Sequence, residues 1–110
     1  MAVVQPSLFE GWSTVVEDAR ALGKPILLSD LPVHYEQAPD HAEYFNRMNT
    51  DDLIQKIGRL MMTLRPGPDL FSEQKARVQS LLLVRDCALQ FCCIAAEAQY
   101  LYGKTGEKKP

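Results

Sequence analysis

Two carboxylates near the start of the chain, Glu10 and Asp18, have a spacing and a setting that suit a ligand site. Between them the chain leaves a loop and enters a helix, which Ser13 or Thr14 can cap. The first turn of a helix presents free backbone N–H groups and the positive end of the helix dipole, so it suits a phosphate or a sugar hydroxyl. Gly11 lets the backbone approach such a ligand closely.

The placement of the two carboxylates predicts the kind of ligand. Glu10 precedes the helix and Asp18 is expected in its first turn, so both can lie near the mouth of the helix. Carboxylates accept hydrogen bonds from vicinal hydroxyls, and two of them suit a ligand with two diols. A nucleotide sugar is such a ligand, with one diol on the ribose and another on the hexose. Acidic side chains early in a helix also act as simple partners of the helix dipole, and this alternative stays open.

The elements that must hold these residues form a βαβ unit. Val3–Pro6 reads as the end of a short strand, and a helix is expected from about Val15 to Leu22. Gly23 suits the residue after a helix end, and Ile26–Ser29 has the apolar composition of a buried strand in a parallel sheet. This order predicts an α/β domain that binds ligands beyond the carboxyl ends of its strands.

The rest of the chain is expected to be mainly helical. The patterns predict a loop over Asp30–Asp40, a short strand at Glu43–Phe45, a helix over Asp51–Thr63 capped by Asn49 or Thr50, and a long helix over Ser72–Tyr102. The long helix is apolar nearly all round, so it needs partners on more than one side. Its expected buried residues include Ala76, Leu83, Ala88, Phe91, Ile94, Ala95, Ala98 and Leu101.

The sulfur-containing side chains are expected to be structural. The spacing of Cys87, Cys92 and Cys93 suits neither a metal site nor a disulfide framework, so they are interpreted as small reduced core residues. The Met61–Met62 pair is likewise expected in the core. Arg77 and Arg85 are expected to face solvent or an absent domain.

Other polar and aromatic side chains have two interpretations each. His34 and His41 are too few for the usual zinc-hydrolase motif, and His34 is expected as a polar loop residue. Asp30 suits a turn as readily as a ligand contact. Trp12 is expected to pack against the loop rather than to stack on a base.

Length and charge restrict the function classes. The 110 residues suffice for one small domain, and a hydrophobic share of 46 % is ordinary for a globular protein. A net charge of −2 argues against broad binding to nucleic acid or anionic membranes. Neither a signal peptide nor an apolar run of roughly 18 residues is present, so a cytoplasmic protein without a transmembrane segment is expected.

One stretch also resembles a known family. Glu10–Ala19, followed by Gly23-Lys24-Pro25, closely resembles the E-x7-E signature of the group 1 (family 4) retaining glycosyltransferases of the GT-B fold. Ser29–His34 and Glu36-Gln37 look like the strand and loop that follow the signature in that family. The similarity is dense up to about Phe45, and a late helix pair is typical of the end of such enzymes.

The resemblance implies a role for each residue of the signature. Glu10 matches the acid that contacts donor-sugar hydroxyls. The family's turn that meets the sugar and the diphosphate corresponds here to the backbone of Gly11, Trp12, Ser13, Thr14 and Val15.

The second acid of the signature, which binds the ribose diol, matches Asp18. The family usually has Glu there, so a shorter Asp implies weakened nucleotide binding, with Glu17 as a partial substitute. The family uses a nucleoside diphosphate sugar as co-substrate and needs no metal and no further cofactor. No residue of this chain is assigned as catalytic.

The implied fold is a partial Rossmann-like domain, the GT-B C-terminal domain, with a long C-terminal helix. Residues 1–103 match the distal part of the nucleotide-sugar-binding domain, and residues 104–110 are expected to be a flexible tail. The family's Arg and Lys that clamp the diphosphate, and its N-terminal acceptor domain, have no counterpart here. A complete enzyme is expected to transfer a hexose to a glycan or lipid acceptor with retention, whereas this chain alone is expected to be inactive.

Two alternatives remain open. The chain can be a catalytically inactive remnant or a small module that forms homo-oligomers through its exposed long helix and an unpaired sheet edge. It can also be another α/β binding protein that uses the same βαβ unit, because fold does not determine function.

Overall fold

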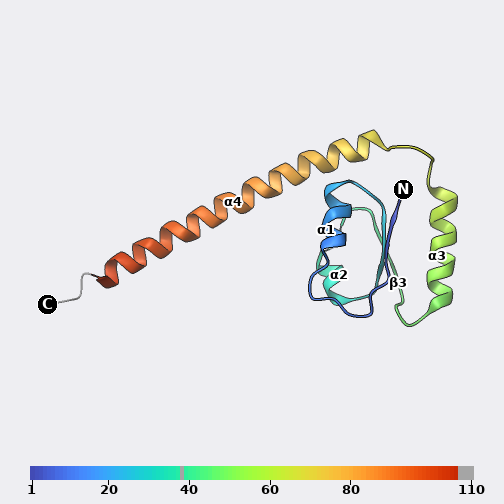
Figure 1. Cartoon of the computed structure of the whole chain (residues 1–110), viewed down its shortest axis with the longest axis horizontal. Coiled ribbons are helices and arrows are strands. Elements are labelled where there is room, and N and C mark those ends of the chain that lie inside the picture. Colours follow the sequence, from blue (N-terminus) through green and yellow to red (C-terminus); the bar gives the residue numbers. More distant parts are fainter. Residues whose placement is uncertain (38, 107–110) are drawn as a thin grey trace. The chain divides into compact units, whose positions relative to one another are not determined.

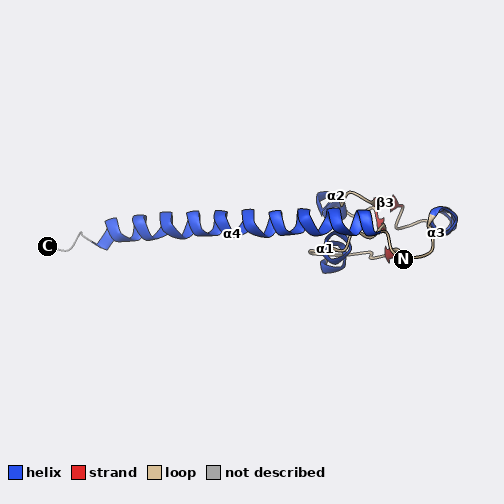
Figure 2. Ribbon diagram, turned by 90° about the horizontal axis from the view of Figure 1, so that it is seen from above, coloured by secondary structure: helices blue, strands red, loops and turns tan. Residues whose placement is uncertain are grey.

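The computed structural model describes residues 1–37 and 39–106, with side chains through residue 103. The chain divides into two units, Met1–Val78 and the part from Gln79 onward. The first unit holds β1 (Val3–Gln5), α1 (Thr14–Ala21), β2 (Ile26–Ser29), α2 (Pro32–Gln37), β3 (Ala42–Phe45), α3 (Thr50–Thr63) and the first turns of α4 (Leu70–Gly106) (Figures 1 and 2).

The three strands of the first unit form a parallel sheet in the order β1-β2-β3. Val3 pairs with Ile26, and Ile26 pairs in turn with Ala42. All four residues of β2 are buried, as expected for the central strand of a parallel sheet. The predicted α/β class is therefore confirmed, and β2 has the predicted bounds.

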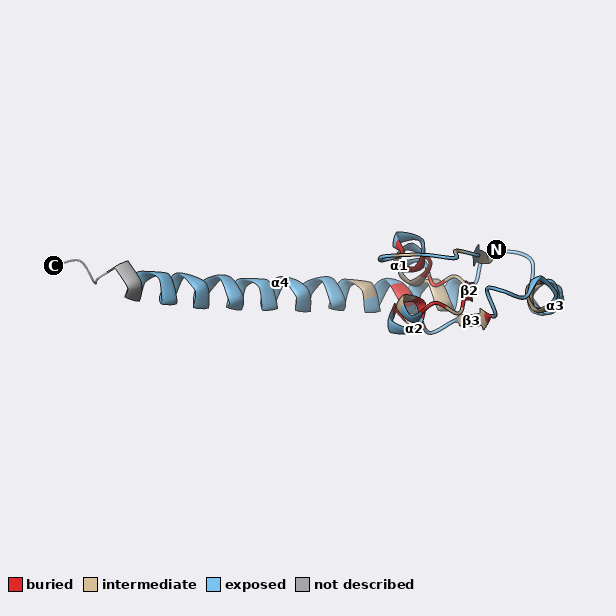
Figure 3. Cartoon of the chain, turned by 90° about the horizontal axis from the view of Figure 1, so that it is seen from below, coloured by how far each residue is buried: buried red, intermediate tan, exposed pale blue. Residues whose placement is uncertain are grey.

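The core of this unit lies between α1 and the sheet. Val16 and Ala19 on α1 pack with Ile26 and Leu28 on β2, and Tyr44 is among the partly buried residues at the edge of this cluster. The buried backbone follows β2 and the inward sides of α1 and α2 (Figure 3). Within the unit, α3 lies on the other side of the strands from α1 and contacts β3 (Figure 1).

The ends of the helices follow local chemistry. Asn49 caps α3, because its Oδ1 accepts from the N–H groups of Asp51 at 3.0 Å and Asp52 at 3.2 Å. Gly23 adopts a φ of 62° directly after α1, as the sequence pattern predicts for a residue that ends a helix. The Asn49 cap and the Gly23 turn each depend on residues a few positions apart, so both helix ends could be predicted from the sequence alone.

The expected loop over Asp30–Asp40 is wrong from Pro32 to Gln37, where the structure forms α2. Pro32 occupies the first helical position, where its missing N–H is no loss. The helix is held to the sheet by its other residues: the rings of Tyr35 and Tyr44 stack with centroids 4.2 Å apart, and Tyr44 donates a hydrogen bond to the carbonyl oxygen of His34 at 3.3 Å. Pro32 therefore begins a helix that tertiary contacts stabilise.

The second unit consists, over its described residues, of the continuation of α4. Arg77 and Arg85 are exposed, as expected. Of the expected buried residues only Ala76, in the first unit, is buried; the exposed ones are Leu83, Ala88, Phe91, Ile94, Ala95, Ala98 and Leu101. The expectation of burial is wrong for these seven, because the second unit contains no other described element that could cover them (Figure 3).

The sulfur-containing residues differ from expectation in the same way. Cys87, Cys92 and Cys93 are free, but they are exposed rather than core residues. Met61 and Met62 are also exposed, Met62 by 90 %. Lys56 of α3 reaches the carbonyl oxygen of Tyr44 in β3, and residues five and six positions later lie on other sides of the helix.

The long helix α4 ends later in the sequence than the expected Tyr102. The helix α4 continues to Gly106 and so includes the first residues of the expected tail, while residues 107–110 lie outside the described part. Within the described residues, none of the helices combines the length and the apolar character needed to cross a membrane.

Candidate ligand site at the carboxyl ends of the strands

A cluster of polar side chains lies where β1 and β2 end and α1 begins. It is built from the loop over residues 6–13, from the end of β2 and from one side of α2. Ser29, the last residue of β2, donates from Oγ to the carbonyl oxygen of Ser7 at 2.6 Å. This hydrogen bond holds the loop against the carboxyl ends of the strands, the edge at which parallel sheets bind ligands.

Glu10 is a fixed carboxylate in this loop. Its Oε1 accepts hydrogen bonds from Ser7 Oγ at 2.6 Å and from Gln5 Nε2 at 2.7 Å. Both bonds favour the charged form: the Ser7 bond, and then the Gln5 bond, lower the pKa of Glu10. Glu10 is therefore an ionised acceptor, and its second oxygen, Oε2, takes no hydrogen bond from the described residues.

Ser13 and Gln37 clamp the entrance of α1. Gln37 Nε2 donates to the carbonyl oxygen of Ser13 at 2.9 Å, and the Ser13 N–H donates to Gln37 Oε1 at 3.3 Å. Ser13 takes the predicted N-cap position, but its side chain makes no capping bond. Ser13 is 2 % exposed, and its Oγ has no hydrogen-bond partner among the described residues. The amide of Gln37, a residue distant in the sequence, thus fixes the backbone that a capping hydroxyl was expected to fix.

His34 is a buried residue of α2, which corrects its expected place in a loop. Its Nδ1 lies 2.8 Å from the carbonyl oxygen of Ser29 and 3.3 Å from Ser29 Oγ. His34 and Gln37 are three residues apart on α2, so they lie on the same side of that helix. Ser29 therefore connects the Glu10 loop to His34, and α2 connects His34 to the Ser13 clamp.

The other residues of the expected sugar site line the open side of the loop. Gly11 and Thr14 are exposed, and Trp12 is 54 % exposed rather than packed. A Cβ on Gly11 would meet no atom of the chain within 4 Å. The space beside this backbone is thus open to a ligand, and the chain's own packing does not require glycine there.

The two acids expected at the ribose have different surroundings. Glu17 lies in the first turn of α1 and accepts from Gln37 Nε2 at 2.8 Å and from Arg20 at 3.1 Å. Asp18 is exposed and lies in the second turn, because α1 begins at Thr14; its expected place in the first turn is wrong. The structure therefore brings Glu17, and not Asp18, into the polar cluster.

Sequence reasoning missed three members of the cluster. Gln5 and Ser7 orient Glu10, and Gln37 holds Ser13. Gln5 lies near the end of the predicted strand Val3–Pro6 and Ser7 directly follows that strand, a position that could have drawn attention to both. The role of Gln37 had no local signal, because its partner lies 24 positions earlier. Asp30, in contrast, stabilises a turn: its Oδ1 accepts a hydrogen bond from the backbone N–H of Arg47 at 3.0 Å, in the turn that follows β3.

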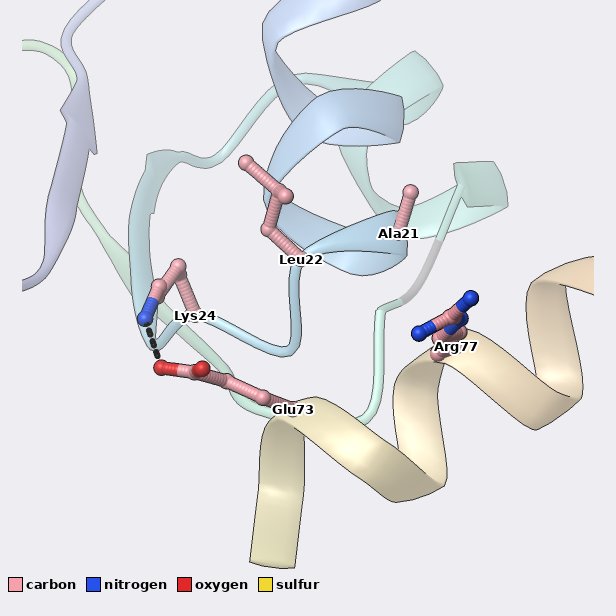
Figure 4. Close-up of a pocket in the computed structure, with 5 residues that line it drawn as sticks. All are labelled: Ala21, Leu22, Lys24, Glu73 and Arg77. Atoms are coloured by element: carbon pink, nitrogen blue, oxygen red, sulfur yellow. Dashed lines mark hydrogen bonds and ion pairs between the residues drawn. The ribbon is translucent and has the colours of Figure 1, made fainter. Parts of the chain in front are cut away.

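The structure also has a shallow hollow of about 350 Å³ at the other end of α1, lined by Ala21, Leu22, Lys24, Glu73 and Arg77 (Figure 4). Lys24 and Glu73 form an ion pair across it. The hollow adjoins the C-terminal end of α1, whereas Glu10 precedes its N-terminal end, so the hollow is not part of the polar cluster. Among the residues whose side chains are described, no three His, Cys, Asp or Glu gather in a way that could hold a metal ion.

No protein-family model, curated protein or solved structure matches the chain. We therefore infer its function from its own residues and contacts.

Proposed function

We propose that the first unit is the donor half-site of a group 1 (family 4) retaining glycosyltransferase, the distal part of a Rossmann-like nucleotide-sugar-binding domain of the GT-B type. The observation that carries this proposal is the ionised Glu10, oriented by Ser7 and Gln5, beside the N-terminus of α1 and beyond the ends of two parallel strands. An oriented acceptor next to free N–H groups suits a ligand with both hydroxyls and phosphates.

In this proposal the sugar and the diphosphate meet different groups. Glu10 Oε2 accepts from hexose hydroxyls, while the first free N–H groups of α1 face the diphosphate. The N–H of Ser13 is already engaged by Gln37, so the phosphate contacts fall to the helix residues from Thr14 onward. The open space beside Gly11 gives the ligand access to this backbone.

The ribose end of the proposed site is weaker. Asp18 is exposed and is the residue that matches the ribose-binding acid, but its side chain is short. Glu17 already accepts one hydrogen bond on each oxygen, from Gln37 and from Arg20, and these contacts restrict how far its side chain can move to assist Asp18. We expect nucleotide binding that is retained but weak.

Sugar transfer requires more than this half-site. The leaving diphosphate needs cations to stabilise its developing charge, and the acceptor needs its own site. In this proposal the cations come from a part of the nucleotide-sugar-binding domain that has no counterpart in this chain. A separate N-terminal domain holds the acceptor, which is a glycan or a lipid. The chain alone is expected to bind donor without turning it over.

A titration followed by amide NMR tests the donor site. UDP-glucose and GDP-mannose, added to millimolar concentration, are expected to shift the amide signals of residues 10–18 and to leave those of α3 unchanged. Glu10→Gln is expected to weaken binding by about fivefold to tenfold, because it replaces a charged acceptor. Glu43→Gln, an exposed carboxylate of β3, is the matched control and keeps the wild-type affinity. A titration without any shift in residues 10–18 contradicts the proposal.

A second candidate, a module that self-associates through α4, rests on the exposed apolar surface of the second unit. Leu81, Leu83, Phe91 and Ile94 are all exposed large hydrophobic residues. At about 100° per residue, the polar residues Gln79, Asp86, Gln90 and Glu97 fall in one stripe about 40° wide, and Arg85 and Gln99 are isolated polar residues on the opposite side of the helix. An apolar surface over most of a helix is typical of a segment that packs against other helices.

Sedimentation velocity tests the second candidate. The wild-type chain is expected to form oligomers whose fraction rises with concentration. Phe91→Glu, on the apolar side, is expected to give monomers, whereas Gln90→Glu, within the polar stripe, keeps the wild-type distribution. A wild-type chain that stays monomeric at all concentrations rules the module out.

A further inference from the structure

The imidazole of His34 is held in one tautomer. Its Nδ1 faces the carbonyl oxygen of Ser29 at 2.8 Å, and a carbonyl oxygen only accepts. Its other neighbour, Ser29 Oγ at 3.3 Å, gives its own hydrogen to the carbonyl oxygen of Ser7. Both neighbours of Nδ1 are therefore acceptors, so Nδ1 carries the hydrogen and Nε2 of the neutral ring is a bare acceptor.

This acceptor lacks a partner among the residues that the structure describes. His34 is 0 % exposed, and its Nε2 makes no hydrogen bond with any described residue. Buried polar atoms are nearly always hydrogen-bonded, and an unsatisfied one reduces stability. An orphaned atom in a polar cluster next to an open loop therefore points to a donor that comes from outside the chain.

Two observations place this atom beside the candidate ligand site. Ser29 binds both the imidazole and the loop that carries Glu10, so the ring lies directly behind that loop. Ser13 Oγ is a second buried atom without a partner among the described residues, and it lies at the N-terminus of α1, in the clamp that α2 forms through Gln37. The two orphaned atoms thus belong to the same cluster; because both are buried, a ligand reaches them only if the residues that cover them move.

We propose that His34 Nε2 accepts a hydrogen bond from a hydroxyl of the bound ligand, which makes His34 a specificity-determining residue of the donor half-site. The inference rests on the proposed function and adds which part of the ligand His34 recognises. A bare imidazole nitrogen accepts from a sugar hydroxyl, whereas it faces a phosphate oxygen lone pair to lone pair. Ser29 ties the ring to the loop that carries Glu10, which is the hexose side of the proposed site, so the group recognised here is the hexose and neither the diphosphate nor the ribose.

The tautomer is tested first, by long-range ¹⁵N–¹H NMR of the ligand-free chain near pH 7. The chain has two histidines, so the exposed His41 is an internal control in the same spectrum. His34 is expected to show a protonated Nδ1 and a bare Nε2, and His41 the averaged pattern of a solvated ring. A protonated Nε2 on His34 overturns the proposal.

Ligand titrations then separate this inference from the proposed function. UDP-glucose is expected to shift the Nε2 signal of His34, whereas UDP alone or inorganic phosphate leaves it unchanged. If amides 10–18 respond to UDP-glucose while His34 Nε2 does not, an ordered water satisfies the ring, and the inference fails while the donor site stands. An equal response to phosphate also refutes it. If nothing responds to any probe, both proposals fail.

Two substitutions supply a readout in affinity. His34→Asn keeps an N–H that can bond the Ser29 carbonyl but removes the Nε2 acceptor, so it is expected to weaken UDP-glucose binding by about fivefold and to leave UDP binding unchanged. His34→Gln places an acceptor near the former Nε2 and is expected to restore part of the affinity. His41→Asn is the control. A folded His34→Asn chain that binds UDP-glucose as tightly as the wild type contradicts the inference.

Discussion

At the scale of single residues, the cluster around Glu10 shows how neutral side chains prepare a charged one. Ser7 and Gln5 donate to the same carboxylate oxygen, so they orient the group and favour its ionised form. Neither donor carries a charge. Both bond Oε1, so the other carboxylate oxygen, Oε2, remains available to a ligand. An acceptor prepared in this way before binding loses less conformational freedom when the ligand arrives.

The pH dependence of stability tests the state of Glu10. A carboxyl group whose pKa is lower in the folded chain than in the unfolded chain stabilises the fold above its unfolded pKa, and this contribution is lost as the pH falls through the folded value. The pKa of Glu10 is lowered from its ordinary 4.5, so the window lies at and below that pH. Glu10→Gln is expected to reduce the loss of stability on acidification, measured by urea unfolding at a series of pH values.

A matched variant controls for the removal of one charge. Glu43→Gln removes an exposed carboxylate of β3 and is expected to keep the wild-type dependence on pH. If the unfolding midpoints of Glu10→Gln and the wild type change in parallel through this window, the hydrogen bonds of Glu10 do not lower its pKa.

At the scale of elements, the junction after α1 is the most constrained backbone in the first unit. Gly23 has a φ of 62°, in the left-handed region that favours glycine. A Cβ at Gly23 would lie 2.6 Å from the carbonyl oxygen of Ser72 and 3.0 Å from the Cβ of Ala76. Both residues belong to the first turns of α4, so Gly23 allows these turns to pack against the βαβ unit, where Lys24 also pairs with Glu73.

Replacing glycines in two different settings tests this account. Gly23→Ala is expected to lower the free energy of unfolding by about 2–3 kcal/mol, from backbone strain and the contact with Ser72. Gly58→Ala, inside α3 where a Cβ meets nothing within 4 Å, is expected to raise it by about 0.5–1 kcal/mol. Thermal or urea unfolding measures both, and a neutral Gly23→Ala would mean that α4 does not pack against this junction in solution.

At the scale of the whole molecule, the described contacts that hold the sheet lie within the first unit. The cluster of Val16, Ala19, Ile26 and Leu28 and the contacts of Gly23 and Lys24 with α4 all precede Gln79. The second unit, by contrast, has no other described element to cover its apolar side chains. The two units therefore differ in what stabilises them.

Truncation tests this division. A chain that ends at Val78 is expected to keep the dispersed amide signals of the sheet, because it retains the core and the first turns of α4. A chain that ends at Asp69 is expected to lose stability, because it lacks the residues that pack on Gly23 and pair with Lys24. Loss of dispersion in the chain ending at Val78 would mean that residues from Gln79 onward support the sheet.

Local patterns were sufficient for most of the elements. The apolar run of β2, the Asn49 cap of α3 and Gly23 after α1 each act through neighbours in the sequence, so the βαβ unit and the α/β class could be predicted. Glu10 and Ser13 could be selected as candidate site residues for the same reason, since a loop that enters a helix has known hydrogen-bonding needs.

Only the tertiary structure decided what these residues contact. It formed α2 within the stretch that was expected to be a loop, buried His34 against Ser29 and bonded Gln37 to Ser13. It also left the second half of α4 exposed. The physical reason is one of range: caps and apolar periodicity act within about one helical turn, whereas burial and the pairing of polar atoms depend on segments far apart in the chain. The sequence by itself thus determined the elements and the candidate loop, and packing decided which side chains that loop brings together.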